Sequence, residues 1–267
     1  MMRASLKICC GLVALLGPVR PVHSQVPVYP SYSASSIANA AANIAGFYAA
    51  NIFISIYGQH LSSVTQAILA SDIHYINLPG QLPGSGVRVL INHQPASIFY
   101  VSPTQVNVLI PITLTPGPVV VQVVDDGRAG PEVVIRLDEA APALFAMEDG
   151  LAIATHLDGQ LVTRESPAGR GEIVVLYAGG LGATSPTTVA SQIPQVPARL
   201  VRSSSFQVLL NGVPVDSSKI LYAGVAPFFA GLFQINLRLP DYAPNDPDIR
   251  IGFPGQLSPP GRLLPLR

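Results

Sequence analysis

Short apolar runs separated by Gly, Pro, Asn and Asp follow one another along the chain from Ile52 onward. Several runs alternate apolar and polar residues, as in Phe233–Leu239, so one face enters a core and the other meets solvent. Helical periodicity is plausible only at Ile37–Ala50 and Val64–Ala70. The pattern therefore predicts an all-β protein with strands at Ile52–Tyr57, Val87–Asn92, Ser97–Val101, Val106–Ile110, Val119–Val124, Val133–Leu137, Glu172–Tyr177, Phe206–Asn211, Ile220–Tyr222, Phe233–Leu239 and Ile249–Phe253.

Three of these sequence blocks occur twice, in the same order. The pairs are Ile54–Leu61 with Val174–Leu181, Val89–Pro95 with Val208–Pro214, and Gln105–Pro111 with Gln234–Pro240. Their offsets are 120, 119 and 129 residues, so the second copy carries about ten extra residues, which fall near Tyr222–Gly231.

The repeated blocks have a physical interpretation. Asn92-His93 and Asn211-Gly212 each follow an apolar strand and precede a Pro, which is typical of a tight hairpin, because Asn and Gly tolerate positive φ. Each copy has about the length of an immunoglobulin-like sandwich. We predict two tandem immunoglobulin-like β-sandwich domains related by the repeat, 37–140 and 141–267, with a boundary in Asp138–Pro142.

The N-terminus has the pattern of a secretory signal peptide, which we assign to residues 1–24. Arg3 and Lys7 precede the short apolar stretch Ile8–Gly17, and Val22-His23-Ser24 suits a cleavage site. The alternatives are an uncleaved anchor or a buried first strand. We expect a secreted, periplasmic or cell-envelope protein without a membrane span after cleavage, beginning with a flexible lead-in at 25–36. Both cysteines fall in the predicted signal peptide, so no disulfide is expected in the body.

Composition narrows the classes of function. Charged residues make up 11% of the chain and apolar residues 49%, which favours a folded body over disorder. The formal net charge is zero, with 15 basic and 15 acidic residues, and no basic run is present. A nucleic-acid partner is therefore not expected, and no cofactor motif occurs.

Five segments are similar to a known family. They are Ile54–Leu61, Tyr100–Asn107, Ala141–Phe145, Gly171–Pro186 and Leu221–Pro240. In content and order they resemble the C-terminal β domain of uncharacterised exported proteins from Solibacter-like acidobacteria. The resemblance implies paired β-sandwich modules without catalytic residues. One departure is Ala49-Ala50-Asn51, where the family has Pro-Gly-Ser before the first strand.

The candidates for catalysis are few. Ser185 lies in Gly182-Ala183-Thr184-Ser185-Pro186, but the Pro that follows removes the N–H that a nucleophile turn lends to an oxyanion hole. His156 and Asp158 could pair as base and acid, yet His156–Gly159 is more simply a hairpin turn. A serine hydrolase is thus a remote alternative, and we predict a protein that is not an enzyme.

Metal and ligand sites were also weighed. The loop Asp241–Asp248 offers oxygen ligands for Ca²⁺, although an ordinary turn is the simpler interpretation. Sugars stack on aromatic rings, but the four tyrosines at corresponding repeat positions are expected in the core or at corners: Tyr57, Tyr100, Tyr177 and Tyr222. Phe228 and Phe229, in the insertion, are the binding candidates; burial under the sandwich is favoured and an exposed apolar patch is the alternative.

These observations favour a non-catalytic structural or interaction module of the cell envelope or secreted fraction. It would act through surfaces or strand edges on a protein or polysaccharide at the cell surface. A carbohydrate-binding module is the main alternative. The difference between the two copies at Phe228-Phe229 is where function is expected first.

Overall fold

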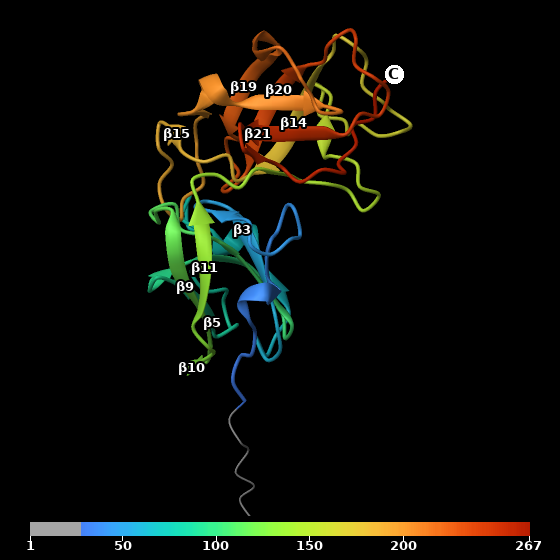
Figure 1. Cartoon of the computed structure of the whole chain (residues 1–267). Coiled ribbons are helices and arrows are strands. Elements are labelled where there is room, and N and C mark those ends of the chain that lie inside the picture. The colour runs from blue at the N-terminus through green and yellow to red at the C-terminus, as the bar shows by residue number, and fades with distance from the viewer. Residues whose placement is uncertain (1–27) are drawn as a thin grey trace, which may run out of the picture.

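The computed structural model describes residues 28–267, so the predicted signal peptide and the start of the lead-in lie outside the described residues. The prediction of an all-β protein is confirmed, because the described chain folds into four sheets and its only helices are short 3₁₀ turns. Figure 1 shows two β units stacked end to end, with the chain entering at the end of the first unit that lies farther from the second. None of the described helices has the length or apolar character to cross a membrane.

The first unit pairs a five-stranded sheet with a six-stranded one. The five-stranded sheet has the order β1 (Ile37–Asn39), β3 (Phe53–Tyr57), β8 (Gln105–Leu109), β7 (Ser97–Val101) and β4 (Gln66–Ala67). The other has β2 (Tyr48–Ala49), β11 (Val133–Asp138), β9 (Gly117–Asp125), β5 (Val87–Ile91) and β6 (Gln94–Pro95), with β10 (Arg128–Ala129) on β9. Only β2 and β11 pair in parallel. Two 3₁₀ turns, η1 (Ala34–Ser36) and η2 (Ala70–Asp72), complete the unit.

The second unit pairs a seven-stranded sheet with a four-stranded one. The larger sheet has the order β12 (Ala143–Leu144), β14 (Ile173–Gly179), β20 (Phe233–Arg238), β19 (Ile220–Val225), β16 (Ala198–Leu200) and β15 (Thr184–Ser185), with β13 (Ala154–Thr155) on β14. The smaller has β18 (Val213–Pro214), β17 (Gln207–Leu210), β21 (Ile249–Phe253) and β22 (Gln256–Leu257). The 3₁₀ turns are η3 (Ser203–Ser205) and η4 (Ser217–Lys219).

The two units share one topology. The order β3-β8-β7-β4 recurs as β14-β20-β19-β16, and the β5–β6 hairpin with β9 recurs as β17–β18 with β21. Asn92 and Asn211 both turn their hairpins at positive φ. Each side chain then accepts a 2.8 Å hydrogen bond from the next strand, from the Val120 N–H and the Asp248 N–H respectively. The repeated Asn therefore fixes both the turn and the neighbouring strand.

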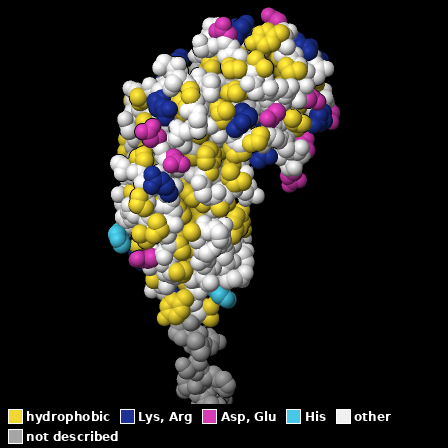
Figure 2. Space-filling view, viewed as in Figure 1, with side chains coloured by type: hydrophobic (Ala, Val, Ile, Leu, Met, Phe, Trp, Pro, Cys, Tyr) yellow, Lys and Arg dark blue, Asp and Glu magenta, His cyan; other side chains and the backbone are white. Residues whose placement is uncertain are grey.

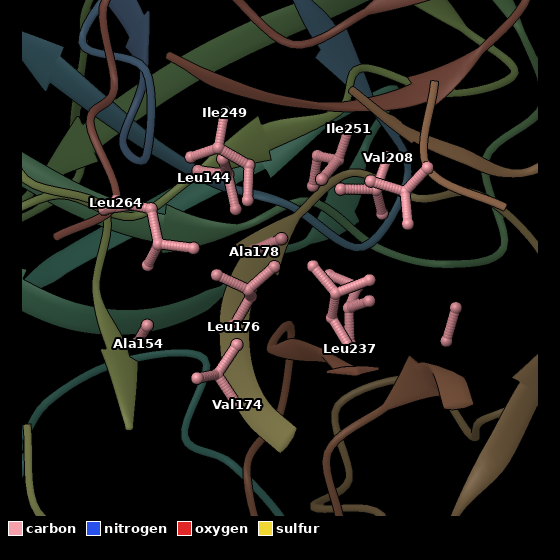
Figure 3. Close-up of a cluster of buried hydrophobic side chains, with 14 of the residues drawn as sticks. Leu144, Ala154, Val174, Leu176, Ala178, Val208, Leu237, Ile249, Ile251 and Leu264 are labelled. Carbon is pink, nitrogen blue, oxygen red and sulfur yellow. The ribbon is translucent and has the colours of Figure 1, made fainter. Parts of the chain in front are cut away.

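Each unit has its own apolar core between its two sheets. The core of the second unit is shown in Figure 3, where Val174 and Leu176 of β14, Leu237 of β20 and Ile251 of β21 converge. All four are fully buried. Strict alternation along these strands sends every second residue inward, as the sequence pattern predicts.

Two predictions about local structure are wrong. The segments expected to have helical character contain no α-helix; Ile37–Asn39, Tyr48–Ala49 and Gln66–Ala67 are short edge strands instead, because pairing with longer strands outweighs a weak helical periodicity. Residues 31–36 are not a flexible lead-in. Ser31 pairs with Gln59, so this stretch is held on the first unit.

Candidate interaction surface

About half of the extra residues of the second copy lie in the loop between β19 and β20; the others precede β19, where residues 215–219 correspond to Ala96 alone. Residues 226–232 connect β19 to β20, whereas residues 102–104 suffice at the corresponding place between β7 and β8. The loop is held at its base by a 2.9 Å hydrogen bond from the Ala226 N–H to the Leu232 carbonyl, and near its tip by a 2.7 Å bond from the Phe228 N–H to the Pro194 carbonyl. It therefore has a defined shape.

This loop also contacts the first unit. Gly231 adopts φ +68°, and a Cβ added there would lie 2.5 Å from Cδ1 of Leu109 and 2.9 Å from Cε2 of Phe53. A side chain at this position would be strained by the positive φ, and the ends of the Leu109 and Phe53 side chains would have to move to admit its Cβ. The loop thus lies at the junction of the two units.

A second segment from the second unit reaches the first unit nearby. The Ile193 N–H donates to the Ile76 carbonyl at 2.8 Å, and the Gln192 side chain donates to Oδ1 of Asn77 at 3.1 Å. Because the Pro194 carbonyl in this segment accepts from the Phe228 N–H, the segment 192–194 and the loop 226–232 support one another. The junction is therefore built from backbone pairing and glycine packing.

At this junction Phe228 and Phe229 are exposed, so the expectation of burial is wrong. Their exposed fractions are 64% and 59%. Phe228 adopts φ +69°, a left-handed conformation that is rare for a bulky residue. Neither ring belongs to the apolar core of either unit.

The loop that carries the two rings is apolar, and the neighbouring segment at Pro194 adds the uncharged polar side chains of Gln192 and Gln195. Between Gly224 and Gly231 the loop carries only Val, Ala, Pro and Phe side chains. Val196, just after the segment 192–194, is 56% exposed, and Tyr75, just before the segment 76–77, is 98% exposed. We call Tyr75, Val196, Phe228 and Phe229 the junction surface. Figure 2 shows that charges elsewhere are dispersed, with the two signs interspersed and no broad basic or acidic patch on the visible face.

A cleft of about 440 Å³ lies elsewhere between the units, lined by apolar side chains such as Leu114 and Leu181. Its charged lining residues are Asp138, Glu139 and Arg202, and Arg202 contacts Glu139 at 3.2 Å and lies 4.2 Å from the centre of the Phe253 ring. The guanidinium is therefore already engaged within the protein.

His156 pairs with Glu172 rather than with Asp158. Nδ1 of His156 lies 2.5 Å from Oε1 of Glu172, whereas Asp158 accepts from the Gln160 N–H within the hairpin turn. The hydrogen bond to Glu172 raises the pKa of His156. Burial opposes ionisation of Glu172, but bonds from the Gly169 N–H and His156 outweigh it and lower its pKa. Sequence spacing could not reveal this pair, since the partners are 16 residues apart.

The other nitrogen of His156 faces Ser166, so Ser166, His156 and Glu172 contact one another in the order of a Ser-His-Glu triad. Nε2 lies 3.4 Å from Oγ of Ser166 and 3.2 Å from the Ser166 carbonyl oxygen. With two protons the ring donates to both Glu172 and that carbonyl; with one proton, on Nδ1, its Nε2 can accept from the Ser166 hydroxyl. Pro167 lacks an N–H, and the Ser166 N–H donates to Oγ1 of Thr163, so neither offers an oxyanion donor beside Ser166. The arrangement joins two turns.

Ser185 lies in the edge strand β15, paired with Arg199, and His156 is bonded to Glu172 and Ser166.

The Asp241–Asp248 loop holds the C-terminal segment. Oδ1 of Asp248 accepts from the Gly261 N–H at 2.8 Å, Asp246 contacts Arg164 at 3.0 Å, and Asn245 accepts from Arg170. The side-chain oxygens of Asn245, Asp246 and Asp248 thus already have donors. No group of three or more His, Cys, Asp or Glu between residues 28 and 267 is placed to hold a metal ion.

The four repeat tyrosines are not core residues. Because Ile56 and Leu176 point inward, the adjacent Tyr57 and Tyr177 point outward, each opposite a Gln on the next strand. Tyr57 is 39% exposed. Tyr222 fits the corner interpretation, since its hydroxyl donates to the Val225 carbonyl at 2.7 Å.

No family model and no curated protein sequence matches the chain. Among solved structures, it is similar to a mixed-linkage glucan utilization locus SGBP-B from Bacteroides ovatus, in complex with a mixed-linkage heptasaccharide. The identity is 10%, 95% of this chain and 69% of that chain are covered, and the TM-score is 0.31. It is also similar to domains 5–6 of the S-layer protein SbsC, with 8% identity, 89% and 98% coverage and a TM-score of 0.25. Similarities this weak carry no argument about function.

Proposed function

We propose that this protein is a non-catalytic, exported interaction module that binds a protein partner through the junction surface. The signal-like N-terminal sequence supports export to the envelope or secreted fraction. The observation that carries the proposal is the exposure of Phe228 and Phe229 on a loop whose base is fixed.

Two features of this loop cost stability. A bulky residue in the left-handed region is strained by about 1–2 kcal/mol, and exposed aromatic rings forgo the stabilisation that burial would give. Strain retained at a defined place is typical of functional sites. The shorter loop of the first copy connects the equivalent strands without either cost, so the fold itself does not require the aromatic tip.

The chemistry of the loop favours an apolar protein surface over a sugar. From Gly224 to Gly231 no side chain can donate or accept a hydrogen bond. This loop can therefore offer a sugar only ring faces, and the one side-chain hydroxyl of the junction surface belongs to Tyr75. Aromatic residues surrounded by apolar neighbours are instead typical of the central anchors of protein interfaces.

The test is photo-crosslinking in intact producing cells, with a benzophenone amino acid replacing Phe229. The matched control position is Tyr242, which is 67% exposed but lies outside the junction surface. We expect one defined adduct from position 229, identified by mass spectrometry, that is absent from position 242 and lost when Phe228→Ser is added. The same adducts from both positions, or no adduct from either, would contradict the proposal. An adduct with twice the mass of the chain would mean that the partner is a second copy of this protein.

A further inference from the structure

An open groove of about 740 Å³ lies beside the end of β3, away from the junction surface. Phe53, at the start of this strand, contacts the second unit through Gly231, whereas Tyr57, at its end, borders the groove. The lining residues come from the segment before β1, the end of β3 and the start of β8: Ser31, Tyr32, Ser33, Ser36, Tyr57, Gly58, Gln59, Thr104 and Gln105.

The walls of the groove are fixed by the backbone. Ser31 and Gln59 exchange two hydrogen bonds of 2.9 Å. A Cβ at Gly58 would lie 2.3 Å from the Ser31 carbonyl oxygen, so only glycine allows the two segments to approach this closely. The Tyr32 hydroxyl donates to the Pro131 carbonyl at 2.6 Å and accepts from the Val123 N–H at 2.7 Å. The site is therefore formed before any ligand arrives.

The lining is uncharged and rich in hydroxyl and amide groups. Gln105 is oriented by a 2.8 Å bond from its Nε2 to Oδ1 of Asn107, which leaves its carbonyl oxygen available. Within residues 28–267, the Tyr57 hydroxyl, the Gln59 amide and the Thr104 hydroxyl make no hydrogen bond. The groove thus combines donors and acceptors with the partly exposed ring of Tyr57.

From these features we infer that the groove binds a neutral oligosaccharide or polysaccharide. An anionic or cationic ligand would find no counter-charge in the lining, and an apolar ligand would cover unpaired hydroxyl and amide groups. An added peptide strand would need unpaired backbone, but the Gly58 and Gln59 N–H groups are already bonded to Thr104 and Ser31. A sugar ring places its C–H face on the Tyr57 ring and its hydroxyl groups against the amides.

The second copy supplies a natural comparison. The outward Tyr and Gln persist there as Tyr177 and Gln234, which are paired across β14 and β20. The positions of Gly58 and Gln59, however, hold Ala178 and Gly179. The second sheet therefore keeps the aromatic ring but loses the amide beside it, so binding is assigned to the first copy alone.

Affinity electrophoresis in gels containing neutral polysaccharides (dextran, galactomannan, β-glucan, xylan) tests the inference, with polygalacturonate and heparin as anionic comparators. At least one neutral polymer should retard the protein. Tyr57→Ala should weaken that retardation by about tenfold, since ring stacking contributes on this scale. Gln59→Ala should weaken it less, and the matched variant Tyr177→Ala should leave it unchanged.

Urea unfolding midpoints identify variants that fail to fold, and Tyr57→Phe, which keeps the ring, should retain most of the binding. No retardation by any neutral polymer, retardation by the anionic polymers alone, or equal losses in Tyr57→Ala and Tyr177→Ala would overturn the inference. A Phe228→Ser/Phe229→Ser variant should bind the polymer normally, so this result is independent of the protein partner proposed above.

Discussion

Replacing Gly231 by Ala tests how strongly the two units are coupled through the inserted loop. The new Cβ would lie 2.5 Å from Cδ1 of Leu109 and 2.9 Å from Cε2 of Phe53, so side chains or backbone in the first unit must shift. Overpacking of this kind costs about 1–3 kcal/mol. The φ of +68° adds a left-handed penalty of about 1–2 kcal/mol. We therefore expect the free energy of unfolding to fall by about 2–5 kcal/mol.

The measurement is urea unfolding followed by circular dichroism and tyrosine fluorescence. Gly212→Ala is the matched control, because its φ is +79° but a Cβ there would meet nothing within 4 Å. It should cost only the left-handed penalty. If the contact at Gly231 couples the units, the unfolding transitions of Gly231→Ala measured by circular dichroism and by tyrosine fluorescence should no longer coincide. Equal losses in the two variants would refute the role of the junction contact.

Three further predictions concern local features. Because the pKa of His156 is raised and that of Glu172 is lowered, the stabilisation lost in His156→Gln should be largest between pH 4.5 and 6.5, at about 1 kcal/mol. The difference in unfolding free energy between the wild type and His156→Gln should decrease as pH rises through the folded pKa of the histidine or falls through that of the glutamate. A difference that does not change with pH would contradict the pairing. Asp248→Ala should cost about 1 kcal/mol and expose the C-terminal segment to protease, because two backbone N–H groups lose their acceptor; unchanged proteolysis would argue against this anchor. Phe228→Gly should leave the free energy of unfolding unchanged or raise it by up to about 1 kcal/mol while abolishing cross-linking, since glycine relieves the positive φ; a large loss of stability would mean that the ring serves the fold.

Strand positions were predictable from the sequence because alternation is a local property of the chain. The expected strands at Ser97–Val101 and Ile249–Phe253 have those bounds in the structure, and the others differ at their ends. The repeated Asn of each hairpin was equally readable, since its positive φ depends on the residue itself. The weak helical periodicity near Ile37 led to a wrong prediction. This segment pairs with β3, and a local sequence pattern contains no information about such a contact between segments.

The sites depended on contacts between distant segments. The partner of His156 is Glu172, 16 residues away in the sequence, and not the neighbouring Asp158; only folding brings the two side chains together. The length difference between the copies was readable, but its division between two connections and the exposure of Phe228 were not.

The all-β class and the repeat can be read from the amino-acid sequence, because residue periodicity and turn chemistry act over a few residues. Which aromatic rings face solvent and which polar groups share a groove depends on how distant segments pack. Burial of a side chain depends on what other parts of the chain cover it, and those parts, as with Ser31 beside Gln59, come from separate segments of the chain.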